Sequence, residues 1–440
     1  MPVGSPTFFL FVAAVFFVYW AAPQTRFIRL AIILSANYFF CSRYGWLYVA
    51  LLPACATIDF LIGRALAVHK SRILIFASVT INISALIASR HTGWAMPLGL
   101  SFYTLQSLTY TMDIYRRDID PARDLFSYLA AVSFFPTLQA GPITRVAEIL
   151  KQLEKRAPLT AVEGGHAFFL IGIGLLKKVL IADFLADNLV NRVFDTPNLY
   201  SGAEALLAVY GYSLQLYYDF SGYSDIARGA AQLLGIKLPV NFDRPYLSTN
   251  LTEFWRRWHI SFSNWLRDYL YFSIPGARTK VMPYLGLVIT MVLGGLWHGV
   301  TWNFAIWGLL HGTALAVVRL CWAWRGRPKQ LPAWRRAVGI VGTYHFVCFT
   351  WIFFRAGSVG AAFDLLSRIA SLTAGFENVT AMFATVLALG VVALWMRHDT
   401  FRERFAASPF YVHAAALVLI AMIIQRWGAT STAPFVYSRF

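Results

Sequence analysis

Two histidines have sequence neighbours that favour chemistry over ordinary packing. His298 follows LGGLW and precedes GVTW, and His259 ends the sequence WRRWH. Imidazole is the usual side chain for taking a proton from a hydroxyl near neutral pH. At the end of an apolar run an imidazole needs a partner, so a functional role is the first hypothesis. His298 is therefore a candidate general base, although local sequence favours a histidine bonded to a neighbouring helix equally.

Basic residues surround the second histidine. Arg256 and Arg257 lie beside His259, and guanidinium groups bind phosphate and carboxylate oxygens in pairs. The segment could bind a phosphorylated donor such as coenzyme A, but local sequence slightly favours lipid headgroups. His311 lies 13 residues after His298, so on one continuous helix the two would face different directions.

A carboxylate within an apolar stretch is a further candidate. Asp219 lies in LYYDFSGYSD, close to Ser221. It could orient a histidine or close a polar network; alternatively, these residues could cap a helix. The chain has no HExxH, GxSxG or Walker sequence, and its scattered cysteines form no CxxC pair, so no metal site is predicted.

The composition predicts that membrane helices position these residues. Of the 440 residues 58% are hydrophobic and 13% are charged, against about 25% charged in soluble domains. Apolar runs long enough to cross a bilayer recur along the chain. The net charge of +17 would suggest nucleic acid in a soluble protein. Here we assign it to cytoplasmic loops and lipid headgroups, and we expect no nucleic-acid partner.

We therefore predict an all-α polytopic membrane protein with about 11 to 13 transmembrane or re-entrant helices, plus interfacial helices. The candidate spans are 7–22, 27–41, 46–66, 72–89, 125–141, 165–186, 203–220, 281–297, 300–322, 337–354, 380–396 and 410–424. Segment 96–115 has polar residues that suit a helix packed inside protein. Connectors 115–124 and 143–160 are basic, which favours the cytoplasmic side. Residues 221–280 interrupt the apolar pattern, and their Trp and Arg residues predict an interfacial helix.

Several of these segments together resemble a known family. DFSGYSDIARG, LPVNFDRPYLSTNLTEFWRRWHISFSNWLRDYLYF and LGGLWHGVTWNFAIWGLLHG are similar to signature sequences of the membrane-bound O-acyltransferases. The similarity is greatest to the bacterial branch that includes the alginate O-acetyltransferase membrane subunit. PLGLSFYTLQSLTYTMDIYRR, FFPTLQAGPITR, WIFFRA and PFVYSRF also match, in family order. Ser438-Arg439 stand where the branch often has Phe-Gln. This departure concerns the identity of the partner protein and not the chemistry.

The resemblance implies one membrane-embedded domain over residues 1–440, with a core that encloses a tunnel. Peripheral spans would occupy 1–90, the signature core 97–355 and the C-terminal spans 356–440. The resemblance also implies no bound cofactor. The acyl donor would be acetyl-CoA or another acyl thioester, entering from the cytoplasm.

Site residues follow from the resemblance position by position. His298 matches the essential histidine, and we expect it to act as general base on an acceptor hydroxyl. His259 matches the second conserved polar position and would orient the thioester or stabilise charge on its carbonyl. His311 matches a third histidine less strongly. The residues that match positions lining or supporting the site are Arg256, Arg257 and Trp258, expected to bind the donor, and Asp219 and Ser221.

The implied activity is transfer of an acyl group, most simply acetyl, across a bacterial cytoplasmic (inner) membrane by a multi-pass protein. A periplasmic SGNH-type acetyltransferase would then pass it to a polysaccharide or another envelope glycan. Expected partners are membrane lipids, the thioester donor, that acetyltransferase and the glycan. A first alternative is acylation of teichoic acid, peptidoglycan or a lipid-linked sugar from a carrier-protein thioester.

Two alternatives come from other classes. A transporter with a polar lumen would explain the spans and Asp219. It would not explain the block of paired Trp and Arg, and no inverted repeat is visible. A non-catalytic membrane scaffold is the remaining alternative.

Overall fold

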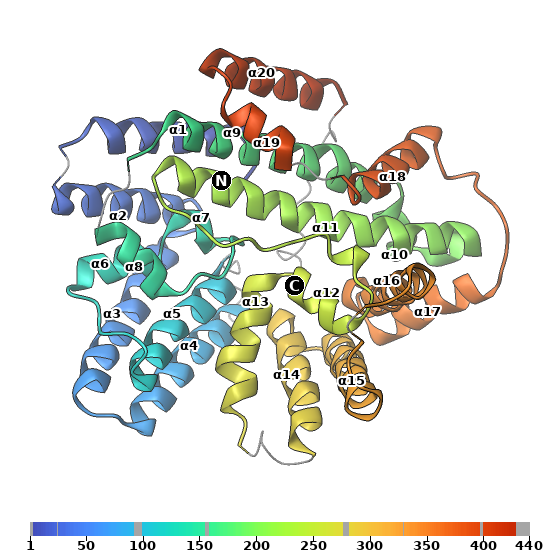
Figure 1. Ribbon diagram of the computed structural model, residues 1–440, viewed down its shortest axis with the longest axis horizontal. Coiled ribbons are helices and arrows are strands. Elements are labelled where there is room, and N and C mark those ends of the chain that lie inside the picture. The colour runs from blue at the N-terminus through green and yellow to red at the C-terminus, as the bar shows by residue number, and fades with distance from the viewer. Residues whose placement is uncertain are drawn as a thin grey trace. The chain divides into compact units, whose positions relative to one another are not determined.

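The structure is a computed structural model that describes residues 3–23, 25–91, 99–154, 158–275, 281–328, 330–396 and 399–427. Within these ranges every regular element is a helix, which confirms the all-α prediction (Figure 1). Residues 96–98 of the predicted segment 96–115 and the Ser438-Arg439 departure lie outside the described residues.

Two compact units make up the chain. The first unit comprises Met1–Gly174, Tyr223–Pro239 and Thr400–Leu417, and the second comprises Leu175–Gly222, Val240–Asp399 and Val418–Phe440. Both units are built from separate stretches of sequence. The predicted single domain over residues 1–440 stays a prediction.

Helices of the first unit include four that follow the predicted spans 7–22, 27–41, 46–66 and 72–89 closely. The helices of this unit are α1 (Pro6–Ala21), α2 (Arg26–Ser42), α3 (Trp46–Val68), α4 (Arg72–His91), α5 (Leu100–Arg116), α6 (Leu125–Val132), α7 (Phe135–Leu138), α8 (Val146–Glu154), α9 (Ala161–Leu175) and most of α19 (Asp399–Ala406). Nearly all side chains of α5 are buried, as its polar residues predict. Helices α3, α4 and α5 lie side by side (Figure 1).

A buried carboxylate joins these three helices. Asp59 of α3 accepts hydrogen bonds from Ser78 (2.7 Å) and Asn82 (2.7 Å) of α4 and from Ser107 (2.6 Å) of α5. All three donors are neutral groups. Both carboxylate oxygens are therefore bonded within the apolar interior, as buried polar groups require.

The predicted span 125–141 is wrong, because the helix breaks. Helix α6 ends at Val132, and the short α7 begins at Phe135 with Pro136, which has no N–H to continue a helix, in its first turn. Asn37 of α2 bonds both sides of the break. Its amide donates to the carbonyl of Ala130 (3.2 Å), and its oxygen accepts from the N–H of Phe135 (2.9 Å).

The second unit holds the elements that carry the candidate site. They are η1 (Leu176–Asp183), η2 (Ala186–Val190), α10 (Asn191–Asp195), η3 (Pro197–Leu199), η4 (Pro245–Leu247), α12 (Leu251–Arg257), α13 (Ile260–Trp265), η5 (Leu266–Leu270), η6 (Tyr271–Ser273), α14 (Met282–His298), α15 (Trp302–Arg325), α16 (Ala333–Arg355), α17 (Val359–Ala370) and α18 (Ala381–Ala393). Helices η1, η2 and η5 are π-helical. The interfacial helix predicted in 221–280 is therefore several short helical segments.

Helices α11 (Gly202–Leu233) and α20 (Phe410–Trp427) contribute to both units. The polar interruption predicted to begin at residue 221 begins later, because α11 continues to Leu233. Its last turns bury Ile226 and Ala230, so small and apolar residues keep the helix packed despite nearby serines.

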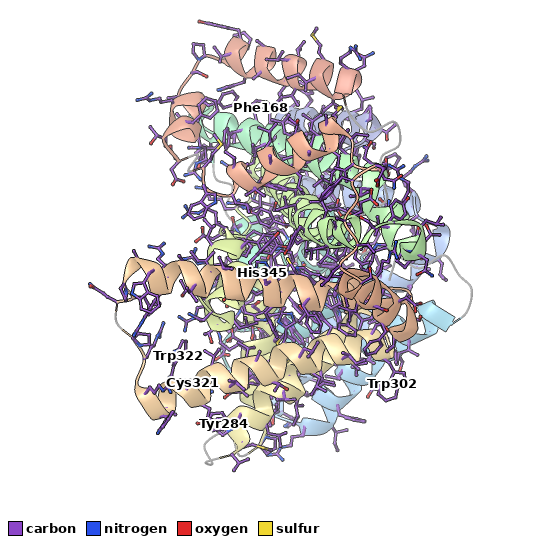
Figure 2. All side chains as sticks on the ribbon, turned by 90° about the vertical axis from the view of Figure 1, so that its right-hand side faces the viewer. Phe168, Tyr284, Trp302, Cys321, Trp322 and His345 are labelled. Atoms are coloured by element: carbon purple, nitrogen blue, oxygen red, sulfur yellow. The ribbon has the colours of Figure 1, made fainter. Side chains whose placement is uncertain are left out.

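Three helices of the described chain are long and apolar enough to cross a membrane, namely α3, α15 and α16, and five shorter apolar helices accompany them. Helix α15 has an exposed Trp302 at one end, and a half-buried Trp322 and an exposed Trp324 near the other (Figure 2). Tryptophan is enriched at both surfaces of a bilayer. Length, composition and these aromatic ends make the chain an all-α membrane protein.

Candidate active site

His298 is the last residue of α14, and a close helix pair fixes its position. A Cβ on Gly295 would collide with the carbonyl oxygen of Phe304, and one on Gly308 with that of Met291. Glycine at both contacts allows the antiparallel helices α14 and α15 to touch through their backbones. The backbone that carries His298 therefore has little room to move.

Aromatic rings surround the buried imidazole of His298. Its ring centroid lies 5.0 Å from Phe354, 5.4 Å from Trp307 and 5.7 Å from Phe262. These rings exclude bulk water and lower the local dielectric constant. A charge that develops beside His298 would therefore interact strongly with the groups around it.

His259 is the N-cap residue of α13 and has a backbone conformation that is rare for residues with a side chain. Its φ of 41° lies in the left-handed region. Such strain is often retained at functional sites. Burial, together with the charge of His298, holds the pKa of His259 well below its ordinary value. The imidazole of His259 is therefore neutral at physiological pH.

The structure places His259 and His298 against the same side chain, that of Phe262. The ring of Phe262 lies 5.0 Å from the His259 ring and 5.7 Å from the His298 ring. Phe220 of α11 packs against His259 at 4.6 Å. Two imidazoles in one apolar environment are an arrangement that can accept and return a proton.

His311 is separate from this pair in its bonding. The indole N–H of Trp255 donates to Nδ1 of His311 (3.3 Å), and Nε2 lies 2.9 Å from the hydroxyl of Thr350. Nδ1 is thus an acceptor, and Nε2–H donates to Thr350, whose hydroxyl donates to the carbonyl of Val347 (2.8 Å). Both nitrogens of His311 are used in joining α12, α15 and α16.

Arg256 and Arg257 line a basic pocket of about 630 Å³ together with Arg327 and Arg336. Arg257 pairs with Glu253 at 2.6 Å. Burial raises the pKa of Glu253, but hydrogen bonds from Thr249 and the charge of Arg257 outweigh it, so the net shift is downward.

The other guanidinium groups of this pocket form no close ion pair with another described residue, although the charge of Arg336 also helps to lower the pKa of Glu253. Among the residues that the structure describes, no carboxylate lies within 4.0 Å of Arg256, Arg327 or Arg336. The pocket therefore carries an excess of positive charge that suits phosphate groups.

Trp258, expected to bind the donor, lies in the aromatic core instead. Its ring packs on Phe254 at 5.6 Å, on Trp351 at 5.1 Å and on Tyr246 at 5.8 Å. It is almost fully buried and does not line the basic pocket. Its position supports the backbone of α12, and through it the neighbouring arginines and His259.

Asp219 and Ser221 lie inside α11, so their interpretation as a helix cap is wrong. Asp219 forms an ion pair with Lys178 of η1 at 2.8 Å, and Lys178 also pairs with Asp183 at 2.6 Å. The sequence reasoning missed Lys178 and Asp183. A signal was present, because KK and D interrupt an apolar run in LLKKVLIAD, and charges inside such runs need partners.

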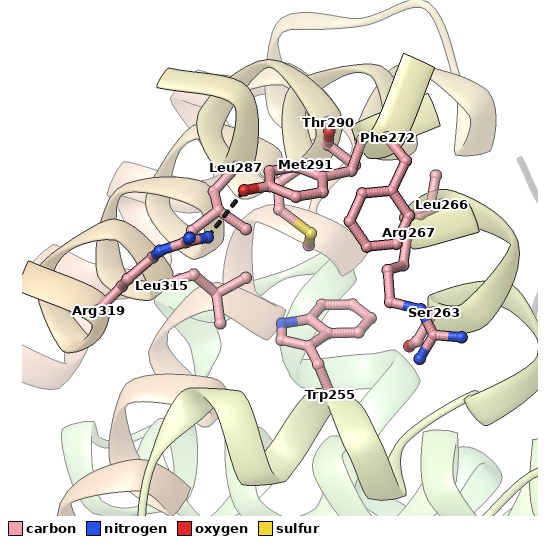
Figure 3. A pocket seen from close by; sticks show the side chains of 11 residues that line it. Trp255, Ser263, Leu266, Arg267, Phe272, Leu287, Thr290, Met291, Leu315 and Arg319 are labelled. Atoms are coloured by element: carbon pink, nitrogen blue, oxygen red, sulfur yellow. Dashed lines mark hydrogen bonds between the residues drawn. The ribbon is translucent and has the colours of Figure 1, made fainter. Parts of the chain in front are cut away.

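A second pocket, of about 740 Å³, was not predicted. Apolar side chains from α12, η5, η6, α14 and α15 line it, with Trp255, Met291 and Leu315 among them (Figure 3). Arg319 donates to the hydroxyl of Tyr271 (2.7 Å) at this pocket.

The model of the membrane-bound O-acyltransferase family matches residues 78–357. The chain belongs to this family. The match includes every candidate site residue, and it confirms the resemblance based on the signature sequences.

Relatives agree with the bacterial branch. The chain is 41% identical over 278 residues to the probable alginate O-acetylase AlgI of Azotobacter vinelandii, which is 63% of this chain and 54% of that protein. It is 32% identical over 424 residues to the peptidoglycan O-acetyltransferase of Helicobacter pylori, at 84% and 78% coverage. It is 33% identical over 274 residues to the teichoic acid D-alanyltransferase of Bacillus subtilis, at 58% and 68%. Thus the match spans about half the length of the Azotobacter protein.

Proposed function

We propose that this protein is a multi-pass O-acyltransferase of a bacterial cytoplasmic membrane that passes an acetyl group from a cytoplasmic thioester towards an extracytoplasmic glycan. The observation that carries the proposal is the pair of buried imidazoles, His259 and His298, on the ring of Phe262. Family membership and the names of the relatives support the acyl-transfer chemistry. They also argue against a transporter or a scaffold.

In the proposed reaction His298 takes the proton of an acceptor hydroxyl. The hydroxyl oxygen bonds to the carbonyl carbon of the thioester, the carbon–sulfur bond breaks, and the thiolate leaves with a proton returned by the site. Water-free aromatic walls around His298 would protect the thioester from hydrolysis. The path by which hydroxyl and thioester reach His298 is proposed to be a tunnel.

The basic pocket is the proposed donor site. Arg256, Arg327 and Arg336 would bind the phosphates of coenzyme A, while Arg257 is held by Glu253. A phosphopantetheine carrier protein, which also presents a phosphate, is the second candidate donor. The same pocket chemistry supports it, and the name of the D-alanyltransferase relative supports teichoic acid as an alternative acceptor. In the acetyl pathway the acceptor downstream would be a periplasmic SGNH-type acetyltransferase and then a glycan.

The first test is acyl transfer from labelled acetyl-CoA in membranes that contain matched amounts of each variant. His298→Ala should lower the rate about 100-fold or more, which is the usual contribution of a general base. His345→Ala is the matched control, because His345 is exposed on α16 and hydrogen-bonds only its own helix in the described contacts (Figure 2). Full activity of His298→Ala would refute the assignment.

A second test addresses the donor. Arg256→Gln should raise KM for acetyl-CoA about tenfold with little change in kcat, since a hydrogen bond to a charged group contributes about 1.5 kcal/mol. Arg319→Gln, at the other pocket, is the control. Equal effects of the two variants would remove the basic pocket from the proposal. Mass spectrometry of envelope glycans with and without the gene would identify the acceptor.

A further inference from the structure

We infer that Asn241 is a positioning residue that holds His259 in the tautomer with its proton on Nδ1, so that Nε2 presents a lone pair to the site. Its catalytic meaning rests on the proposed acyl transfer, whereas the tautomer itself can be measured without any activity. Asn241 lies in the connection between α11 and η4 and was not a candidate from the sequence.

The contacts of Asn241 identify its oxygen. The atom that faces His259 lies 3.1 Å from the backbone N–H of Ser261 and 2.9 Å from the Ser261 hydroxyl. A backbone N–H can only donate, so the atom that it meets must be the amide oxygen and not the amide nitrogen. This contact decides the orientation of the Asn241 side chain.

The same oxygen then decides the protonation of His259. Nδ1 of His259 lies 3.1 Å from Oδ1 of Asn241. An amide oxygen has no hydrogen to give, so Nδ1 must carry the proton of this hydrogen bond. A neutral imidazole has one N–H, and burial keeps His259 neutral. Nε2 is therefore the nitrogen with the lone pair.

The backbone around His259 is fixed by the same residue. The N–H of Ile260 donates to the backbone carbonyl of Asn241 (2.9 Å). Asn241 thus bonds the side chain of His259, the backbone of Ile260 and both donors of Ser261. These bonds hold the left-handed conformation of His259 and aim its ring.

This tautomer changes the role expected of His259. A neutral imidazole whose only N–H is bonded to Asn241 cannot donate to a developing carbonyl oxyanion. Nε2 can instead receive from His298 the single proton that His298 has taken from the acceptor hydroxyl, which leaves His298 neutral and gives a His259 imidazolium whose Nδ1–H still donates to Asn241. Nε2 can return that proton to the leaving thiolate, so the exchange needs no additional reactant. His259 becomes a second base beside His298.

The decisive measurement is nitrogen NMR of the full-length wild-type protein in detergent, with ¹⁵N-labelled histidine. The His259 resonances are assigned by their loss in His259→Gln. We expect Nδ1 to be the protonated nitrogen and Nε2 the unprotonated one. A proton on Nε2 would overturn the inference. If the protein showed no acyl transfer, this result would still stand or fall by itself.

Substitution of Asn241 gives a second readout in the acyl-transfer assay. In Asn241→Asp a carboxylate can still accept from Nδ1–H and Ser261, but it stabilises the imidazolium and raises the pKa of His259. The titratable group that acts on His259 in the described site is His298, which opposes a second proton. The acid limb of the kcat/KM profile should therefore move up by about one to three pH units.

Two comparisons separate positioning from mere support of the fold. Asn241→Ala has no charge to contribute, so it should lower kcat without moving the acid limb upward. Asn198→Asp makes the same change of charge at an exposed residue of η3 that lines neither pocket, and it should leave the profile unchanged. If Asn241→Asp and Asn241→Ala lowered the rate equally, and the acid limb of the kcat/KM profile stayed in place in both, Asn241 would have only a structural role.

Discussion

Two buried carboxylates in apolar helices, one in each unit, are stabilised in different ways. Asp59 of the first unit is bonded by two hydroxyls and an amide, all of them neutral. Asp219 of the second unit shares the ammonium of Lys178 with Asp183. Among the described residues no cation pairs with Asp59, whereas the second arrangement depends on one. Removing the cation of the second arrangement should therefore cost more stability than removing the acceptor of the first.

The largest effect is expected for Lys178→Met. It leaves two carboxylates buried without their cation, and breaking a buried ion pair from one side costs about 3–5 kcal/mol. Denaturant unfolding in detergent would measure the loss. Lys177→Met is the matched control, because Lys177 is the adjacent lysine and is only half-buried. Equal small losses would show that the cluster is not stabilised by its lysine.

A triple variant tests whether uncompensated charge causes the loss of stability in Lys178→Met. Adding Asp183→Asn and Asp219→Asn to Lys178→Met removes the uncompensated charge, so part of the lost stability should return. The non-additivity is the signature of groups that act together. No recovery would mean that packing of the lysine stem, and not its charge, is what the cluster requires.

An intermediate effect is expected for Asp59→Leu. Ser78, Asn82 and Ser107 would lose their acceptor, and a buried group left unsatisfied costs about 1–3 kcal/mol. Rotation of the hydroxyls towards other acceptors should hold the total near the upper end of that range. Acyl transfer per folded molecule should not change, which the membrane assay would check against unfolding data. A specific loss of activity would give the first unit a catalytic role.

The smallest effect is expected for Thr350→Val. It removes the acceptor of the His311 Nε2–H but adds no charge, so we expect about 1 kcal/mol of destabilisation. Activity should remain close to wild type, because His311 joins helices and does not face the His259–His298 pair in its hydrogen bonds. A loss of activity comparable to that of His298→Ala would restore His311 as a catalytic candidate.

Helix positions were largely predictable, because apolar runs of a given length report on membrane helices directly. The exceptions have local causes. The break after Val132 depends on Asn37, which is far away in sequence, and the extension of α11 depends on burial of its small residues. Neither cause can be detected from hydropathy averaged over a short stretch of sequence.

The site was predictable in part. His259 and His298 were identified from their sequence neighbours and from the family resemblance. Only the structure reveals that both contact Phe262. Asn241 was missed because a neutral amide in LPVNFDRPY looks like an ordinary connector residue. The spacing argument about His311 assumed one continuous helix and does not apply, because α14 ends at His298 and His311 lies on α15.

The glycine contacts between α14 and α15 limit how a substrate can reach His298. Sliding one helix along the other by a residue would replace Gly308 at the contact with Trp307 or Leu309, neither of which fits against backbone. A shear movement of this hairpin is thus sterically blocked. We therefore expect rotation of the surrounding rings, such as Phe262 or Phe354, to open access in place of sliding of this hairpin. If side chains control entry in this way, ring size at those two positions should set the rate at which substrate reaches the imidazole.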